Sequence, residues 1–485
     1  MKRLLLLVLV FMLVLSTNVF ADEISMGYAK KDFPESFVPV TKIMLFKKGQ
    51  TLDETLASGW QNLDEKIDVE DFNIYTDDID AFADKYLQIL YKNPLLYYVE
   101  NGFRYAYYSD GKIAYIVPSY TETNKTVINN TIAEIEKATD EVLWHIHGNM
   151  SDFDKIMTVH DYMTLNYEYD QSLKNHSITI MTTKTGVCES YARAFYHVMK
   201  KLGINCGYVT SVPMKHAWNI IELDGKWYHI DLTWDDPTLQ KSDAYAQTNH
   251  TYALLSDKEI SSQENPHYGY NLDGLAADST AYDKAPWHGY GAIVFSGGVD
   301  YYVSGNNLVS SKGEIIYKNL DGGDGGWRLT QTTYLKEAMF ANVSEYNGII
   351  YFNTDMAIYS YNPKTKETKE VLSEIGLGGL FIEGNTLYYS KVDINTLQLK
   401  KAGTIKLGDI CYKEPYYDNN ELIVKVCKET TKPMCIFASG SDKIQSSKIT
   451  GNGLTQIKFS KDSGEQTIFY WDENLTPLRD YEVIK

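Results

Sequence analysis

The chain of 485 residues is 44% hydrophobic, 23% charged and 13% aromatic. This composition is too apolar and aromatic for a disordered polymer, and the length suffices for two or three domains of roughly 100–200 residues. Its 46 Lys and Arg against 64 Asp and Glu give a net charge of −18. Because no strongly basic stretch follows the first residues, the sequence argues against a protein that binds the phosphate backbone of nucleic acids.

The first 21 residues have the pattern of an export signal. Lys2 and Arg3 form a positive end, an apolar run follows from Leu4 to Leu15, and the segment closes at Ala21. The run is shorter than the ~20 residues that span a bilayer, although an uncleaved anchor is the competing interpretation. We expect cleavage after Ala21, a secreted or cell-surface protein, and no transmembrane segment in the mature chain.

Residues 22–125 are predicted to form an N-terminal α/β extension. Apolar residues recur at helical spacing over 51–63 and 78–91. Aromatic strand patterns follow, and Asp110-Gly111 between two of them indicates a hairpin turn. Two amphipathic helices are then expected, over 126–147 and, after a capping box, over 152–165.

Cys188 is predicted to begin a helix. Gly186 breaks the preceding segment, apolar residues recur at helical spacing from Cys188 to Leu202, and Gly203 suits the position after a helix end. A thiol at the start of a helix lies near the positive end of the helix dipole, which favours the nucleophilic thiolate. Cys206 instead lies in an apolar strand pattern, as expected of a buried core thiol.

A predicted hairpin brings a histidine and a carboxylate together. Asp224-Gly225 is a two-residue turn signal that pairs Leu223 with Lys226. In that register His216, Trp218 and Asp231 share one face, and His216 and Asp231 become diagonal neighbours within side-chain reach. A thiol, an imidazole and a carboxylate thus occur in order within one short stretch. This is the set needed for a nucleophile, a general base and an orienting acid.

From about residue 289 helical periodicity nearly vanishes and short aromatic-aliphatic strands recur about every 40 residues. This pattern predicts an all-β region over 285–485, either propeller-like or built of stacked sheets. All ten histidines fall between 145 and 288. Acid–base chemistry near neutral pH is therefore expected in the middle of the chain.

Three motifs together resemble the transglutaminase-like superfamily, and within it the bacterial branch similar to kyphoscoliosis-peptidase domains. They are Gly186–Ala192 (GVCESYA), His216–Asn219 (HAWN) and Trp227–Asp236 (WYHIDLTWDD). The resemblance covers about residues 126–260 and implies an α+β papain-like core in which Cys188 is the nucleophile, His216 the base and Asp231 the orienting acid. Asn166, Tyr167 and Tyr169 are candidates for the second oxyanion donor and, with Trp218, for the substrate pocket.

The expected organisation is therefore a signal peptide (1–21), an N-terminal α/β extension (22–125), a transglutaminase-like catalytic domain (126–284) and a β-rich C-terminal domain (285–485). The expected function is that of an exported cysteine enzyme acting on amide bonds through a thioester, as a peptidase, an amidase or an acyltransferase. Its partner would be a protein or peptide substrate, with cell-wall peptide as one option. No cofactor, metal or nucleic acid is expected.

Two other interpretations compete with this one. Cys188, His216, His229 and Asp231 could ligate a metal, but no paired Cys-x-x-Cys or His-x-x-x-His motif accompanies them. The acidic turn at 321–326 lacks the closing Glu of a calcium loop. Alternatively, the chain is a non-catalytic surface protein whose Tyr-rich β region binds the ligand. Pairing among Cys411, Cys427 and Cys435 is left open.

Overall fold

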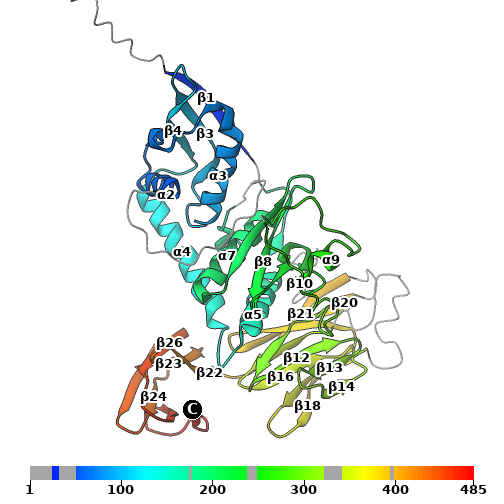
Figure 1. The fold of residues 1–485 in the computed structure, drawn as a ribbon. Helices are drawn as coiled ribbons and strands as arrows, with labels where there is room; N and C mark the ends of the chain where they lie inside the picture. The colour runs from blue at the N-terminus through cyan, green and yellow to red at the C-terminus, as the bar shows by residue number, and fades with distance from the viewer. Residues whose placement is uncertain are drawn as a thin grey trace, which may run out of the picture. The chain divides into compact units, whose positions relative to one another are not determined.

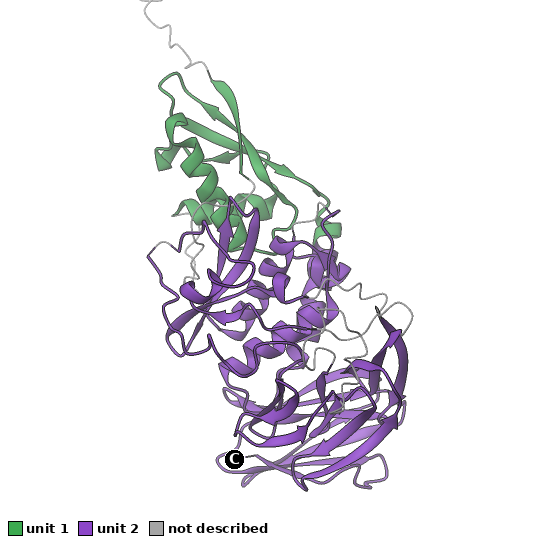
Figure 2. Ribbon diagram, turned by 90° about the vertical axis from the view of Figure 1, so that its right-hand side faces the viewer, with its two compact units in different colours: residues 1–36, 41–128 green, residues 37–40, 129–485 purple. Residues whose placement is uncertain are grey.

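The computed structural model describes residues 24–31, 51–173, 177–236, 248–272, 274–321, 341–393 and 398–484 (Figure 1). The predicted export signal lies outside them, as do residues 322–326 of the acidic turn. The chain divides near residue 128 into two compact units (Figure 2). Among the described helices, none combines the length and the hydropathy that crossing a bilayer demands.

The first unit is an antiparallel sheet with two main helices. Its strand order is β1-β3-β4-β2, and an Asp110-Gly111 turn joins β3 to β4 as predicted. The aromatic rings of Trp60, Tyr86 and Phe103 pack together in its core. The elements are β1 (Ser25–Lys30), α2 (Leu52–Asn62), β2 (Ile67–Asp68), 3-10 turns at Glu70–Phe72 and Thr76–Asp78, α3 (Ile79–Tyr91), β3 (Val99–Tyr107) and β4 (Ile113–Tyr120).

The second unit begins with helices around a four-stranded antiparallel sheet of order β10-β9-β8-β7. The capping box predicted at Ser151 and Asp154 is present. Helix α7 lies against β7 and β8 of this sheet, and α5 packs against α7 and α8 (Figure 1). The elements are α4 (Lys125–Trp144), α5 (Asp152–Asn166), β5 (Glu168–Tyr169), α6 (Ile180–Thr183), β6 (Thr185–Gly186), α7 (Cys188–Leu202), β7 (Cys206–Ser211), β8 (His216–Leu223), β9 (Lys226–Ile230), α8 (Leu232–Asp235), β10 (Ala253–Leu255) and α9 (Asp257–Ile260).

Three consecutive antiparallel meanders follow in the same unit. Buried residues of all three, including Leu308, Ile350 and Leu399, form one apolar cluster. The strands are β11 (Val294–Ser296), β12 (Val299–Ser304), β13 (Asn307–Ser310) and β14 (Ile315–Lys318); β15 (Val343–Tyr346), β16 (Ile349–Asn353), β17 (Ala357–Asn362) and β18 (Glu367–Ser373); and β19 (Leu377–Glu383), β20 (Thr386–Asp393) and β21 (Gln398–Lys406).

Two further sheets, of orders β22-β23-β26 and β25-β24-β27-β28, end the chain. Their inner faces share a second apolar cluster that includes Val424, Ile436 and Ile468. The strands are β22 (Ile410–Asp418), β23 (Glu421–Lys428), β24 (Met434–Ser439), β25 (Ile444–Ile449), β26 (Gly453–Ser460), β27 (Gln466–Asp472) and β28 (Glu482–Ile484). The expectation of a C-terminal part made mostly of strands is confirmed. The choice between a propeller and stacked sheets, and the domain boundaries, stay predictions.

The five cysteines are all free thiols. Cys206 is buried on β7, as its strand pattern predicts. Cys411 and Cys427 lie opposite each other on β22 and β23, and both are buried. Cys435 lies on the neighbouring sheet and is partly exposed.

Candidate active site

Cys188 is the first residue of α7, as the sequence predicts. Immediately before it, β5 and β6 form a short parallel pair in which Tyr169 lies opposite Gly186. A Cβ atom at Gly186 would lie 2.8 Å from both Ile180 Cδ1 and Ser190 Cβ. Glycine therefore permits the close approach that directs the chain into α7. The Cys188 side chain lies at this junction and its residue is 6% exposed.

The hairpin that carries the histidine has the predicted register. Leu223 pairs with Lys226, and Ile220 pairs with His229. Asp224 and Gly225 both have positive φ, 53° and 73°, as a type I′ turn requires. The expectation that Asp231 continues this strand register is wrong, because β9 ends at Ile230 and the chain turns into α8.

Asp231 caps α8 with one carboxylate oxygen and binds His216 with the other. Its Oδ1 accepts the backbone N–H groups of Thr233 at 2.9 Å and Trp234 at 3.3 Å. Its Oδ2 lies 2.6 Å from His216 Nε2. The Asp231 side chain is 1% exposed and the His216 side chain 7%. Capping thus fixes the carboxylate in an orientation that the extended strand would not have given.

The Cys188 thiol lies close enough to the His216 side chain to interact with it and to raise the pKa of the imidazole. Since Nε2 of His216 contacts Asp231, Nδ1 is the nitrogen that remains for the thiol. Burial by itself lowers the pKa of His216, but Asp231 and Cys188 outweigh it and raise that pKa to about 10. Burial alone would raise the pKa of Asp231, yet His216 and His267 hold it well below its usual range. These shifts favour an imidazolium beside an ionised carboxylate.

Two indole rings stack on the His216 imidazole. Trp218 lies 5.6 Å from it, centre to centre, at 19°, and Trp234 lies 5.2 Å away at 26°. Trp218 is itself held by a 3.0 Å hydrogen bond from its Nε1 to His229 Nδ1, and His229 Nε2 contacts Asp257. Trp218 is almost fully buried, so here it supports the imidazole. Contact between Trp218 and a substrate stays a prediction.

The other pocket candidates differ in where they lie. Tyr169 is close enough to Cys188 to interact with it electrostatically, and burial together with Cys188 raises the pKa of the Tyr169 phenol. Tyr167 is fully buried, and its hydroxyl has no hydrogen-bond partner among the described residues. Asn166 donates from Nδ2 to the carbonyl of Tyr162 at 2.7 Å. Of these three candidates, Tyr169 is therefore the one that lies near the thiol.

A second histidine on the carboxylate escaped the sequence analysis. His267 Nε2 lies 2.8 Å from Asp231 Oδ2, across 36 positions of sequence. It comes from an irregular loop after α9, where no period or turn signal indicates its orientation. The concentration of histidines between 145 and 288 was the one available hint.

A second buried network, also missed, lies at the far end of α8. His160 Nδ1 lies 2.9 Å from Asp161 Oδ1, and His160 Nε2 lies 3.2 Å from Asp235 Oδ2. His250 Nε2 approaches the same Asp161 oxygen at 2.7 Å, and the N–H of Ile293 donates to the other. Burial lowers the pKa of His160, but the two carboxylates raise it to about 9. This network joins α5, α8 and the segment that enters β11.

Metal ligation fits neither cluster well. Within the described part of the chain, His160, Asp161 and His250, and also His216, Asp231 and His267, have potential ligand atoms within 4.8 Å of one another. Tetrahedral zinc with bonds of about 2.0–2.1 Å separates its ligand atoms by about 3.3 Å. Both clusters instead contain contacts of 2.6–2.9 Å between ligand atoms, the lengths of hydrogen bonds. Both His229 nitrogens have other partners.

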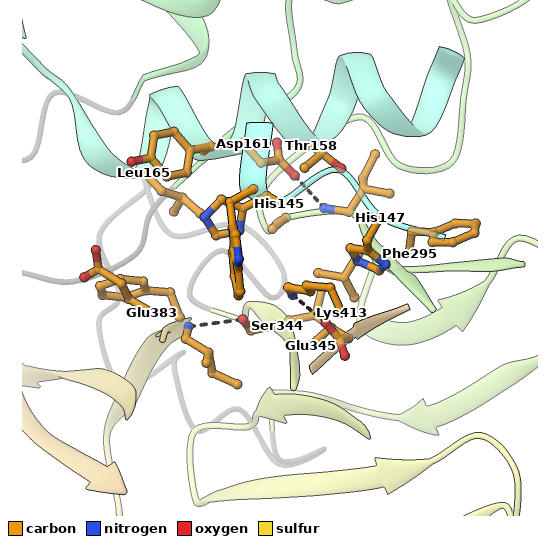
Figure 3. Close-up of a pocket in the computed structure, with 18 of the residues that line it drawn as sticks. His145, His147, Thr158, Asp161, Leu165, Phe295, Ser344, Glu345, Glu383 and Lys413 are labelled. Atoms are coloured by element: carbon orange, nitrogen blue, oxygen red, sulfur yellow. Dashed lines mark hydrogen bonds and ion pairs between the residues drawn. The ribbon is translucent and has the colours of Figure 1, made fainter. Parts of the chain in front are cut away.

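A separate cavity of about 120 Å³ lies where α5 and the end of α4 meet the β-rich sheets (Figure 3). Asn166 belongs to its lining, together with His145, His147 and Asp161. On the β side, Lys413 Nζ lies 2.8 Å from Glu345 Oε2. Neither Cys188 nor its two partners line this cavity, so it is distinct from the site around the thiol.

Comparison with known proteins gives a family match within this unit. Residues 142–232 match the model of the transglutaminase-like superfamily. Kyphoscoliosis peptidase of Mus musculus is 29% identical over 107 residues, which is 17% of this chain and 16% of that protein. The match therefore spans about a sixth of the length of this curated relative.

Among solved structures, a crystal structure of a TGase is similar at 12% identity and a TM-score of 0.22, covering 53% of this chain and 65% of that one. The extracellular domain of the BT4673 one component system from B. thetaiotaomicron is similar at 10% identity and a TM-score of 0.17, covering 57% and 49%. The chain spans less than two thirds of either structure.

Proposed function

Because residues 142–232 form a domain of the transglutaminase-like superfamily, we propose that the protein is a cysteine enzyme that acts on amide bonds through a thioester on Cys188. The observation that carries this proposal is the continuous contact from the Cys188 thiol through His216 to Asp231. A thiol, an imidazole and a buried carboxylate in this order form the arrangement that activates a sulfur nucleophile.

In the first half of the reaction, the Cys188 thiolate, whose proton is held by His216, attacks the carbonyl carbon of the amide. A carbon–sulfur bond forms and a tetrahedral oxyanion develops. His216 then gives the proton to the amide nitrogen, the carbon–nitrogen bond breaks and the amine leaves. Asp231 stabilises the imidazolium and holds its Nε2, which leaves Nδ1 directed to the sulfur.

In the second half, His216 takes a proton from an incoming nucleophile, which attacks the thioester carbonyl. Water gives a carboxylic acid and an amine gives a new amide; in both cases the sulfur leaves as the thiolate paired with the imidazolium. The backbone N–H of Cys188, at the start of α7, is one oxyanion donor in this proposal. We assign the second to the Tyr169 hydroxyl, since Tyr169 is the candidate that interacts with Cys188.

The proposed substrate is a protein or peptide met outside the cytoplasm, in keeping with the export pattern of residues 1–21. The net charge of −18 favours encounter with basic segments by electrostatic steering. We also propose that the three meanders β11–β14, β15–β18 and β19–β21 form a propeller-like arrangement. Each is a run of consecutive antiparallel strands, and their faces share one core.

The test is a screen of peptide mixtures by mass spectrometry, with and without an added primary amine. Wild-type protein is expected to give cleaved or amine-labelled products. Cys188→Ala is expected to give none while its circular dichroism and thermal unfolding stay unchanged. Cys435→Ser, which alters the partly exposed thiol on β24, is the control and should match wild type. Products formed equally by Cys188→Ala would contradict the proposal.

A further inference from the structure

The Asp231 carboxylate is surrounded by four hydrogen-bond donors. Its Oδ1 accepts two backbone N–H groups of α8. Its Oδ2 contacts two imidazoles at once, His216 Nε2 at 2.6 Å and His267 Nε2 at 2.8 Å. All three side chains are buried. The mechanism proposed above uses one of these imidazoles and leaves the role of the other unexplained.

His267 is held in place independently of the carboxylate. Its backbone N–H donates to the carbonyl of Ile260 at 3.1 Å. The next residue, Tyr268, accepts a 2.7 Å hydrogen bond from Ser211 Oγ through its carbonyl. Gly269 has a φ of +66°, and a Cβ there would lie 2.4 Å from Pro213 Cγ. The loop is therefore closely packed against the end of β7, and the histidine enters the site from a fixed backbone.

The environment of His267 assigns the position of its proton. A carboxylate oxygen only accepts hydrogen bonds, so the proton that joins His267 to Asp231 is carried on Nε2. Nδ1 of His267 is buried and has no partner among the described residues. A proton on Nδ1 would be an unpaired donor in an aromatic pocket whose nearest wall is Trp234, 4.2 Å away between ring centres. His267 is thus a one-sided donor, whereas His216 bridges the carboxylate and the thiol.

We propose that His267 is a positioning residue for the thiol–imidazole pair, acting through Asp231. This inference rests on the proposed function of Cys188. The α8 cap restrains one carboxylate oxygen, and His267 restrains the other at the point where it meets His216 Nε2. The carboxylate therefore cannot rotate away from His216. It also stays ionised in a buried site, because hydrogen bonds to the charged form favour that form.

Other titratable groups surround this arrangement. Cys188 and Tyr169 face it from α7 and β5. Tyr252, immediately before β10, interacts with Asp231 and with Asp235 of α8. His229, paired with Asp257, interacts with both His267 and Asp231 from β9. Any pH profile of the site includes their titration. The assignment to His267 therefore depends on comparing variants at the same pH.

The experiment measures the rate at which iodoacetamide alkylates Cys188, followed by peptide mass spectrometry from about pH 5 to about pH 10. His267→Phe keeps a ring of similar size but has no donor, whereas the amide of His267→Gln can reach the position of Nε2. At pH 6 we expect His267→Phe to react about tenfold or more slowly than wild type, the scale of one hydrogen bond to a charged group. His267→Gln is expected to recover part of that loss.

His197→Phe is the matched control, since it removes another buried histidine on the same helix as Cys188. It should leave the alkylation profile unchanged. A structural role alone would change the thermal unfolding of His267→Phe without shifting its pH profile. If His267→Phe does not fold, His267→Gln is compared with His267→Asn, whose shorter amide cannot reach Nε2. The inference then requires the Gln variant to react faster.

The outcomes separate this inference from the proposed function. If wild-type Cys188 itself reacts slowly at acidic pH, like an ordinary thiol, the proposed function fails. If wild type reacts rapidly and folded His267→Phe reacts equally rapidly with the same profile, the proposed function stands and the role of His267 is wrong.

Discussion

Asp231 and Asp235 lie at the two ends of the single-turn helix α8, and each binds a buried imidazole. Asp231 contacts His216 at 2.6 Å, and Asp235 contacts His160 at 3.2 Å. The backbone N–H of Asp235 donates to the carbonyl of Asp231 at 3.1 Å. The carboxylate beside the candidate base is thus fixed to a second polar network, and through Asp161 and Ile293 to the entry of the β-rich region.

Asp231→Asn is expected to reduce activity on peptides by about 10²–10⁴-fold, as loss of the orienting carboxylate does in related mechanisms. The amide oxygen can still cap α8, so the fold should persist, but the His216 imidazolium loses its counter-charge. Steady-state kinetics on a peptide found in the screen, with unfolding curves beside them, provide the measurement. Asp231→Asn with wild-type kinetics would remove Asp231 from the mechanism.

His160→Gln is expected to change how stability depends on pH. The pKa of His160 is raised to about 9 in the folded chain, against about 6.5 when unfolded. Its stabilising contribution is therefore complete below about pH 6.5 and is lost as pH rises through about 9. We expect the unfolding free energy of wild type to exceed that of His160→Gln by about 3 kcal/mol at pH 6, and by progressively less as pH rises from about 6.5 to about 9.

Urea unfolding of both proteins at each pH measures this difference. The titration of His216, present in both, cancels in the comparison. A difference that stays constant from pH 6 to about pH 10 would show that the two carboxylates do not raise the pKa of His160.

The ion pair between Lys413 and Glu345, beside the cavity, is expected to stabilise the junction of core and β-rich region. The two side chains are only 9% and 8% exposed. Lys413→Met leaves a buried carboxylate unpaired and should cost about 3 kcal/mol or more. The double variant Lys413→Met/Glu345→Gln should recover most of that loss, because the amide still accepts the N–H of Gly348.

Unfolding free energies of the single and double variants form the test. A double variant no more stable than Lys413→Met would mean that the cost comes from the lost contact of the Lys413 ammonium group with the Trp144 ring rather than from the unpaired carboxylate.

The sequence predicts the parts of the site that depend on local signals. The Asp224-Gly225 turn determines the β8–β9 register, and Gly186 and Gly203 delimit α7 closely. Local signals did not show that the chain leaves the strand at Asp231, because the capping preference of Asp competes with continued pairing. His267 was missed because its loop has no period from which an orientation follows. His160 pairs with Asp235 across 75 positions, a contact that no local pattern encodes.

The most direct test of the central claim counts thiolates by their ultraviolet absorbance at about pH 6 in wild type and in Cys188→Ala. The other buried thiols serve as internal controls, because burial raises the pKa of Cys206, Cys411 and Cys427. Wild type is predicted to show about one thiolate per chain that Cys188→Ala lacks, and His216→Ala is predicted to lose the same signal. Equal absorbance of wild type and Cys188→Ala would contradict a thiolate–imidazolium pair, and with it the proposed covalent chemistry.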